Sequence, residues 1–412
     1  MAELSWVSVD AQTGVILADL PDLEVDSIKS TIGRYESAMA YLPLPTAPLD
    51  WQRATLEGGS IMVLLSQPTD RLGQPVGESV PIWGAMVTKC TPNESDVVPL
   101  SLATLESYFD RRYVGDETFT QVGQNAIVAA LVNKYIKAGA KPGLPIRVSY
   151  TGAGALRDRA YKDQEDKTLY SVLTELSGVD GGPEWTVGWE WQHSPERITP
   201  VLYVGDRVGR AVTPGMGAAA TFEMPGPVVA FSLDKDYSAG RGANDVMAVS
   251  TAEGNTRPQS PRQLSADTSR PTFEFRWTPS TSISNVSTLT DHARSALVAL
   301  ANGSKPLSMS AVMDGAPALG IDWAIGDDLG FSIGGLEFDP ATRTARDLFT
   351  DLFTDRFGSD GIVLVNPNGR DSVPAFPGGF AGVARAIGWE LTLTGTRIIT
   401  PTLASAEITG GS

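Results

Sequence analysis

Hydrophobic and polar residues alternate with a period of two in several stretches of the chain. Large apolar residues occupy every second position from Trp185 to Trp191, with Thr, Gly and Glu between them. The same alternation is present at residues 273–277 and 389–394. Period-two alternation of aromatic and β-branched residues is typical of half-buried strands, so we predict a strand in each stretch.

Further strands are predicted where short apolar runs lie between turn-forming residues. The 42 Gly and 28 Pro supply many such turns. Helical connections between successive strands are mostly missing, which favours antiparallel sheets or barrels over a doubly wound fold. These further candidates are residues 60–65, 82–89, 97–109, 146–150, 198–204, 228–233, 246–250, 307–313 and 362–365.

Three helices are predicted between the strands, at residues 120–138, 166–176 and 287–302. In the second, Asp166 is a good N-cap, and apolar residues follow at spacings of three and four up to Leu176. Each helix has one apolar stripe, so we expect each to pack against a sheet.

The fold expected from these elements is a β-rich α+β protein with several β-barrel-like or split-sheet domains and three packed helices. Residues 205–227, 252–271 and 336–359 have the composition of linkers or long loops. We predict four segments: an N-terminal β domain at 1–115, a second α+β domain at 116–221, strands with a long loop at 222–280, and a C-terminal helix with a β-barrel-like domain at 281–412. The strands and loop at 222–280 are expected to return to the first domains, where they are available to complete the N-terminal one.

Composition limits the possible functions of the chain. The net charge of −16 argues against a protein whose main task is to grip nucleic acid. No stretch approaches the roughly 20 apolar residues of a membrane span, and the N-terminal residues predict no signal peptide. The single cysteine, Cys90, lies in an apolar run and is expected to be a buried thiol.

The residue clusters that enzymes and metal sites use are missing from the sequence. Its two histidines, His193 and His292, are far apart, and no Cys/His cluster is present. Gly152 and Gly154 form only a fragment of a dinucleotide-binding fingerprint. We therefore expect no enzymatic activity, no cofactor and no metal.

Asp322, Asp327 and Asp328 form the densest group of carboxylates. Asp327 and Asp328 are adjacent, so on a strand they would point to opposite faces, and a turn that enters a strand at 329–333 is the favoured interpretation. A cell-wall hydrolase that uses Asp322 and Asp328, or a calcium ion bound near Asp327, are the alternatives.

The tryptophan-rich stretch has a second interpretation. Trp185, Trp189 and Trp191 have faces that can stack on sugars, which would make them the platform of a carbohydrate-binding or receptor-binding surface protein. Alternation on one side favours a sheet core or a subunit interface instead.

An apolar group in the last predicted loop is a candidate for subunit contacts. Its spacing places the side chains on one side of a short helix, which either folds back on its own domain or inserts into a neighbouring subunit. The residues are Leu348, Phe349, Leu352, Phe353 and Phe357.

Several short motifs resemble the minor tail proteins of siphophages that infect actinobacteria, which are thought to form the hub at the distal end of the tail. In chain order these motifs are TGVILADLP at 13–21, GRYES at 33–37, LPLP at 42–45, Trp83-Gly84, SLATLESYFDRRYV at 101–114, GDDL at 326–329 and GWELT at 388–392.

This resemblance implies a virion structural protein with a phage tail hub-like fold and no catalytic residue to carry over. Each chain would supply two similar β-barrel-like domains to a homotrimeric ring, which connects the tail tube to distal tip proteins and surrounds the channel for DNA. The implied partners are the distal tail protein, the tape measure protein and other minor tail proteins, with DNA passing without specific binding. Such a protein is made in the host cytoplasm and resides at the distal end of the tail.

Overall fold

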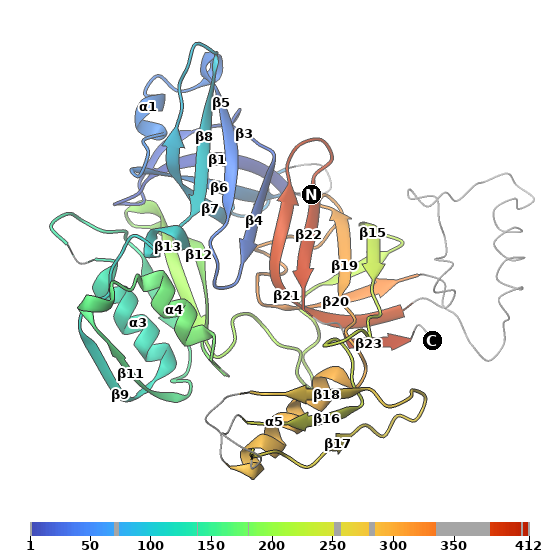
Figure 1. Cartoon of the computed structure of the whole chain (residues 1–412). Coiled ribbons are helices and arrows are strands. Elements are labelled where there is room, and N and C mark those ends of the chain that lie inside the picture. Colours follow the sequence, from blue (N-terminus) through green and yellow to red (C-terminus); the bar gives the residue numbers. More distant parts are fainter. Residues whose placement is uncertain are drawn as a thin grey trace, which may run out of the picture. The chain divides into compact units, whose positions relative to one another are not determined.

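The computed structural model describes residues 2–69, 74–137, 139–179, 181–250, 257–279, 285–334, 380–404 and 407–410. Far more of them belong to strands than to helices (Figure 1). The chain forms two compact units. The larger contains Met1–Ala230, Met309–Leu403 and Glu407–Ser412, and the smaller contains Phe231–Ser308 and Ala404–Ala406. The division into four segments stays a prediction from the sequence.

An antiparallel sheet of seven strands forms the N-terminal part of the larger unit. One of its inner strands, β6 (Ser60–Pro68), is buried at its first seven positions, which matches its almost continuous apolar sequence. In spatial order the strands are β2 (Ile16–Asp19), β1 (Ala2–Asp10), β6 (Ser60–Pro68), β7 (Val80–Cys90), β8 (Val97–Thr104), β5 (Ser37–Pro43) and β3 (Glu24–Val25).

The middle of the larger unit combines a three-stranded sheet, a two-stranded ribbon and two helices. The sheet has the order β10 (Arg147–Tyr150), β13 (Glu196–Gly205) and β12 (Glu184–His193). The ribbon pairs β9 (Glu117–Gly123) with β11 (Leu156–Tyr161). The helices are α3 (Gln124–Tyr135) and α4 (Leu169–Ser177), and short helices elsewhere are α1 (Trp51–Ala54), α2 (Glu106–Phe109), η1 (Leu44–Thr46) and η2 (Asp163–Glu165).

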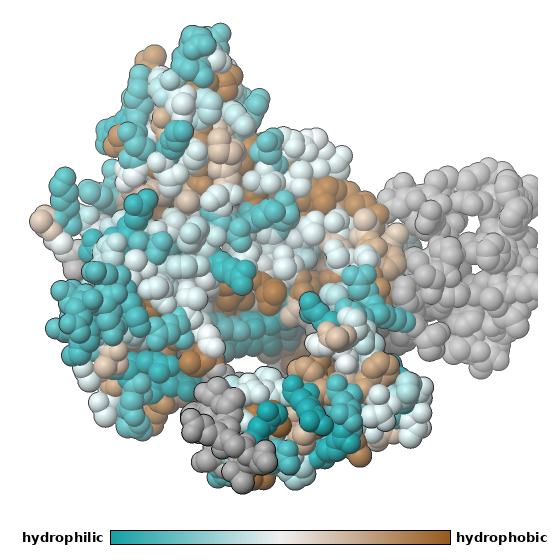
Figure 2. Space-filling model, in the orientation of Figure 1, coloured by the Kyte–Doolittle hydropathy of each residue, from teal (hydrophilic) through white to brown (hydrophobic). Residues whose placement is uncertain are grey.

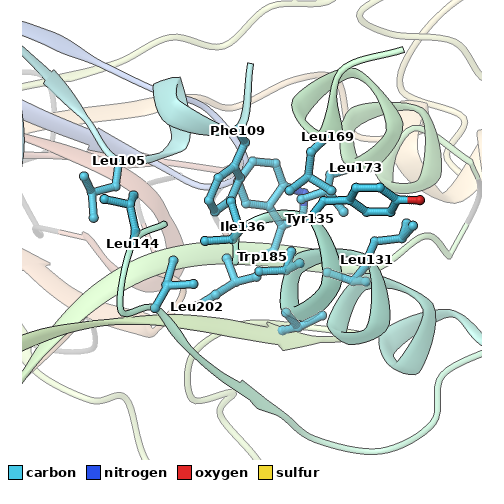
Figure 3. Packing of buried hydrophobic residues seen from close by; sticks show 14 of the residues in the cluster. Leu105, Phe109, Leu131, Tyr135, Ile136, Leu144, Leu169, Leu173, Trp185 and Leu202 are labelled. Carbon is cyan, nitrogen blue, oxygen red and sulfur yellow. The ribbon is translucent and has the colours of Figure 1, made fainter. Parts of the chain in front are cut away.

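One hydrophobic core joins the first sheet to these elements. It includes Val63 of β6, Phe109 of α2, Leu131 of α3 and Leu173 of α4, all at most 1% exposed. Figure 3 shows Trp185 of β12 next to Phe109 within this cluster, where the ring centroids are 5.9 Å apart. The core therefore fixes β12 against the N-terminal sheet.

The C-terminal part of the larger unit is built around the long strand β21 (Phe380–Thr392). It belongs to a sheet of eight strands, in which six strands lie in one row and two more strands pair with β21 outside that row. One of these is β4 (Ser27–Thr31), a strand from near the N-terminus that pairs antiparallel with β21. The other strands are β14 (Thr221–Met224), β20 (Asp328–Ile333), β22 (Ile398–Leu403), β19 (Leu307–Val312), β15 (Val228–Leu233) and β23 (Glu407–Gly410).

The smaller unit packs one helix on a small sheet. α5 (Val286–Leu300) places Leu289 and Ala293 against Val246 and Ala248. The sheet has the order β17 (Gln263–Leu264), β16 (Asp245–Ala248) and β18 (Glu274–Trp277).

The predicted fold class is confirmed, because the chain is mostly β with several sheets and few helices. Most predicted strands are present, but the one at 97–109 ends at Thr104, where α2 follows. β14 lies inside the predicted linker at 205–227, and β17 lies inside the predicted loop at 252–271. The predicted strand at 362–365 and the predicted loop at 336–359 lie outside the described residues.

Two helix starts also differ from prediction. α3 starts at Gln124 instead of residue 120, because the preceding residues pair with β11. The N-cap of α4 is Thr168, whose Oγ1 accepts a hydrogen bond from the Ser171 amide at 3.1 Å. Asp166, the predicted cap, has a φ of 47° and lies in the left-handed region.

Candidate functional site

A cavity of about 450 Å³ lies in the larger unit, where elements of three sheets come together. Strands β7, β12, β13 and β21 contribute to its walls, together with the loops around residues 207–209 and 319–325. Its apolar lining includes Ile82, Trp189, Val208, Leu319, Ile325 and Trp389. A concave, mostly apolar space with a few polar groups is the usual form of a binding site.

Tryptophans of β12 attach the three-stranded sheet to the N-terminal sheet. Trp185 is 1% exposed and packs against Phe109 and Tyr170. Trp189 is 9% exposed and lies against Gly84 of β7. Trp191 donates a hydrogen bond from Nε1 to the carbonyl oxygen of Ser79 at 2.7 Å.

These contacts decide between the two interpretations of the tryptophan stretch. A sugar-stacking platform needs a row of ring faces open to solvent at the surface, and Trp185 and Trp189 are only 1% and 9% exposed. The carbohydrate-platform hypothesis for this stretch is therefore wrong, and the interpretation as a sheet core is confirmed.

A polar clamp beside the cavity connects four chain segments. Both terminal nitrogens of Arg385 donate to the carboxylate of Glu184, and Nη1 does so at 2.6 Å from Oε1. The same guanidinium donates to the carbonyl oxygens of Val208 at 2.8 Å and Gly326 at 3.1 Å. Burial raises the pKa of Glu184, but the hydrogen bonds from Arg385 and from the Val208 amide bring it below its ordinary value.

The three predicted aspartates hold loop backbone in place around this clamp. Asp327 accepts hydrogen bonds from the amides of Arg210 at 2.6 Å and Ala324 at 2.9 Å. Asp322 accepts one from the amide of Ala318 at 2.7 Å.

The Asp328 carboxylate has a similar structural role. It pairs with Arg207 and accepts a hydrogen bond from the Val212 amide at 2.8 Å. Burial raises the pKa of Asp328, and the Arg207 and Val212 hydrogen bonds outweigh this and lower it. The turn that enters β20 is confirmed, and the carboxylates that a hydrolase would need serve as acceptors within the fold.

Close backbone contact explains the glycines of the clamp. A Cβ atom at Gly209 would lie 2.1 Å from the carbonyl carbon of Gly326, and both residues have positive φ angles. Only glycine permits this approach together with this backbone conformation.

A second, much smaller space adjoins the cavity. Its volume is about 20 Å³, and it shares four lining residues with the cavity: Ser30, Ile82, Val187 and Trp189. Glu106 of α2 lines this chamber and is 4% exposed. Burial raises the pKa of its carboxyl group to about 7. No sequence pattern pointed to this residue, because a lone glutamate after an apolar run is usually exposed.

The remaining predicted residues take no part in this site. His193 is exposed, with Nδ1 3.5 Å from Glu78, and His292 packs edge-to-face on Trp277. Cys90 is only half-buried, against expectation, because it lies at the end of β7 next to Thr55. Burial raises the pKa of its thiol. Ala153 and Ala155, which flank Gly154, accept hydrogen bonds from the first amides of α3.

The candidate subunit contacts Leu348, Phe349, Leu352, Phe353 and Phe357 lie outside the described residues, so they stay a prediction. Within the described ranges, no group of three or more His, Cys, Asp or Glu side chains could hold a metal ion. None of the helices in the described part of the chain is long and apolar enough to span a membrane.

Comparisons of the fold find tail proteins. A scan against protein-family models and a search of curated proteins give no match. The tail protein from Neisseria meningitidis MC58 matches over 98% of this chain and 96% of its own, with a TM-score of 0.51 and 12% identity. The 43 kDa tail protein of prophage MuSo2 from Shewanella oneidensis matches over 98% of both chains, with a TM-score of 0.51 and 9% identity.

A structure of the Francisella PdpA–VgrG complex is also similar, with a TM-score of 0.50 and 7% identity. The match covers 98% of this chain and 58% of that one. At these identities the likeness is one of fold. The chain has the fold of phage tail proteins.

Proposed function

We propose that the chain is a structural protein of a phage tail, and that it forms a homotrimeric hub at the distal end of the tail. In this proposal the ring connects the tail tube to distal tip proteins and surrounds the channel for DNA. The observation that carries it is the match in fold to two tail proteins, one of them from a prophage, over almost the whole length of each chain. The sequence motifs that resemble siphophage minor tail proteins add to it.

Exposed strands and side chains support a role in an assembly. Among the described residues, the β9–β11 ribbon has no further strand on either edge. Leu156 of this ribbon is 59% exposed, and Tyr113 and Tyr150 are 61% and 50% exposed. Figure 2 shows hydrophobic patches between the hydrophilic residues of one face. Unpaired strand edges and apolar side chains of this kind are suited to contacts with identical copies.

The charge of the chain supports passage of DNA without specific binding. It has 48 acidic residues against 32 basic ones, and a predominantly acidic wall repels phosphate groups. The expected partners are the distal tail protein, the tape measure protein and other minor tail proteins. We expect no catalytic activity, because the best carboxylate cluster is used to hold backbone amides.

The proposal is tested by the mass of the purified protein and by imaging of the intact tail. We expect a particle of three times the 43.7 kDa of one chain, alone or with its tail partners. A strictly monomeric protein that is missing from the distal end of purified tails would overturn the proposal. Zymography on host cell walls tests the hydrolase alternative, and we expect no clearing.

A further inference from the structure

The Glu106 carboxyl group has an unusual environment for a buried acid. Its Oε1 accepts a hydrogen bond from the Val187 amide at 3.3 Å, and the Thr104 side chain and the backbone amide of Glu106 itself contribute two more to the carboxyl group. Its Oε2 is buried and has no hydrogen-bond partner. The charged neighbour that acts on it is Glu36, which is also an acid, and no described Lys or Arg forms an ion pair with it.

Such a group requires compensation. A buried carboxylate without a counter-charge is costly, so it takes up either a proton or a cation. The chamber that it lines has about 20 Å³, which is room for one group of the size of a water molecule. An ammonium head group meets this size limit.

The adjoining cavity fits the remainder of an alkylammonium ligand. Trp189 borders both spaces, and Trp389 lines the outer one, so an aliphatic stem would contact aromatic rings that also attract cations. The outer cavity also contains Arg207, whose Nε is buried without a partner, and Thr186, which is 3% exposed with an unpartnered hydroxyl group. These groups can donate hydrogen bonds to a carbonyl oxygen.

Arg207 also limits the class of ligand. It is the charged residue of the outer cavity lining and is already paired with Asp328, and no carboxylate is among the described residues that line this space, so a second ammonium group would find no counter-charge there, which disfavours diamines. A lysine residue has the matching arrangement, with one ammonium group, an aliphatic stem and a backbone carbonyl oxygen.

We infer that this cavity and its inner chamber bind a primary alkylammonium group, supplied by a lysine side chain of a neighbouring protein. The ammonium group donates to Oε2 of Glu106, the stem lies along Trp189, and Arg207 donates to the lysine backbone. The site itself is independent of the proposed function, whereas the identification of the neighbour as a tail protein rests on it.

The first test uses the full chain with n-butylammonium chloride, and n-butanol as an uncharged probe of the same shape. Binding at pH 8 is followed by calorimetry and tryptophan fluorescence. A hydrogen bond between charged groups makes binding of butylammonium about tenfold or more tighter than that of butanol. Equal binding of the two probes would overturn the inference.

Variants connect the effect to Glu106. Glu106→Gln should lose about tenfold in butylammonium affinity, and its affinity for butanol should not change. Glu196→Gln, an exposed glutamate on β13, is the matched control and should behave as the wild type. Butylammonium binding that survives in Glu106→Gln would contradict the assignment.

The pH dependence of binding to the wild-type protein is a further test, and it does not require that the Glu106→Gln variant folds. Protons compete with the ammonium group for Glu106, so butylammonium affinity should rise with pH between 5 and 8, with a midpoint near the Glu106 pKa of about 7. Butanol affinity should stay flat. A flat butylammonium profile would overturn the inference.

A last comparison tests the source of the ammonium group. N-acetyl-lysine amide should bind more tightly than putrescine, and the reverse order would overturn the lysine assignment. These experiments use the isolated protein, so their failure is distinguishable from failure of the proposed assembly role.

Discussion

Gly84 of β7 lies against the indole ring of Trp189 of β12, so that a Cβ atom at Gly84 would be 2.4 Å from Cε2 of the ring. Trp189 is 9% exposed and borders both the cavity and the inner chamber. This contact joins two sheets that lie far apart in the sequence. The absence of a side chain at Gly84 is therefore a condition for the position of Trp189.

Gly84→Ala is expected to destabilise the protein by about 1–3 kcal/mol, because a rigid, covered ring must shift. Urea unfolding followed by tryptophan fluorescence measures the change. Gly217→Ala is the matched control, since a Cβ atom there meets nothing within 4 Å. Equal stability of the two variants would show that the ring moves freely.

Glu106 is expected to make stability depend on pH. Its pKa is about 7 in the folded protein against an ordinary value of 4.5, so the folded state binds the proton more tightly. The stabilisation is complete below pH 4.5 and is lost as pH rises through 7.

The size of this effect follows from the shift, and amounts to about 3 kcal/mol between the two limits. Glu106→Gln cannot titrate, so relative to the wild type it should be more stable at pH 8 than at pH 5. Denaturant unfolding at both pH values measures this difference. If the free energies of unfolding of the wild type and Glu106→Gln differ by the same amount at pH 5 and pH 8, the predicted role of Glu106 is wrong.

Arg385→Met is expected to lower the free energy of unfolding by about 2–3 kcal/mol, because Glu184 in the polar clamp keeps its charge and loses its partner. Side chains of the pair are only 19% and 27% exposed, which limits compensation by water. Arg294→Met, in an exposed pair with Asp291, is the control and should have no measurable effect on unfolding. Chemical denaturation of both variants distinguishes the two pairs.

Phe353→Asp is expected to impair assembly more than folding, according to the sequence-based prediction of a plug at Leu348, Phe349, Leu352, Phe353 and Phe357. A charge on an apolar contact surface is costly to bury between subunits. Thermal unfolding of the variant and the mass of its assembled form are the two measurements. Normal assembly with an intact fold would show that these residues do not form the plug.

Local periodicity determined the secondary structure well. The alternation from Trp185 to Trp191 predicted β12, and the apolar spacing up to Leu176 predicted α4. Such patterns are readable from sequence because they record which face of an element is buried. They do not record the partner, so the same tryptophan pattern also suggested a sugar platform. Its covered rings excluded that interpretation.

The amino-acid sequence by itself determined a β-rich chain, the approximate places of its strands and longer helices, and the lack of a metal or nucleophile motif. Only the tertiary structure decided that β4 pairs with β21, that Thr168 and not Asp166 caps α4, and that Glu106 is buried beside a cavity. The physical reason is the distance along the chain between the residues that interact. Burial and pairing of these residues depend on segments up to hundreds of positions away, whereas hydrophobic periodicity reports only on neighbours along the chain.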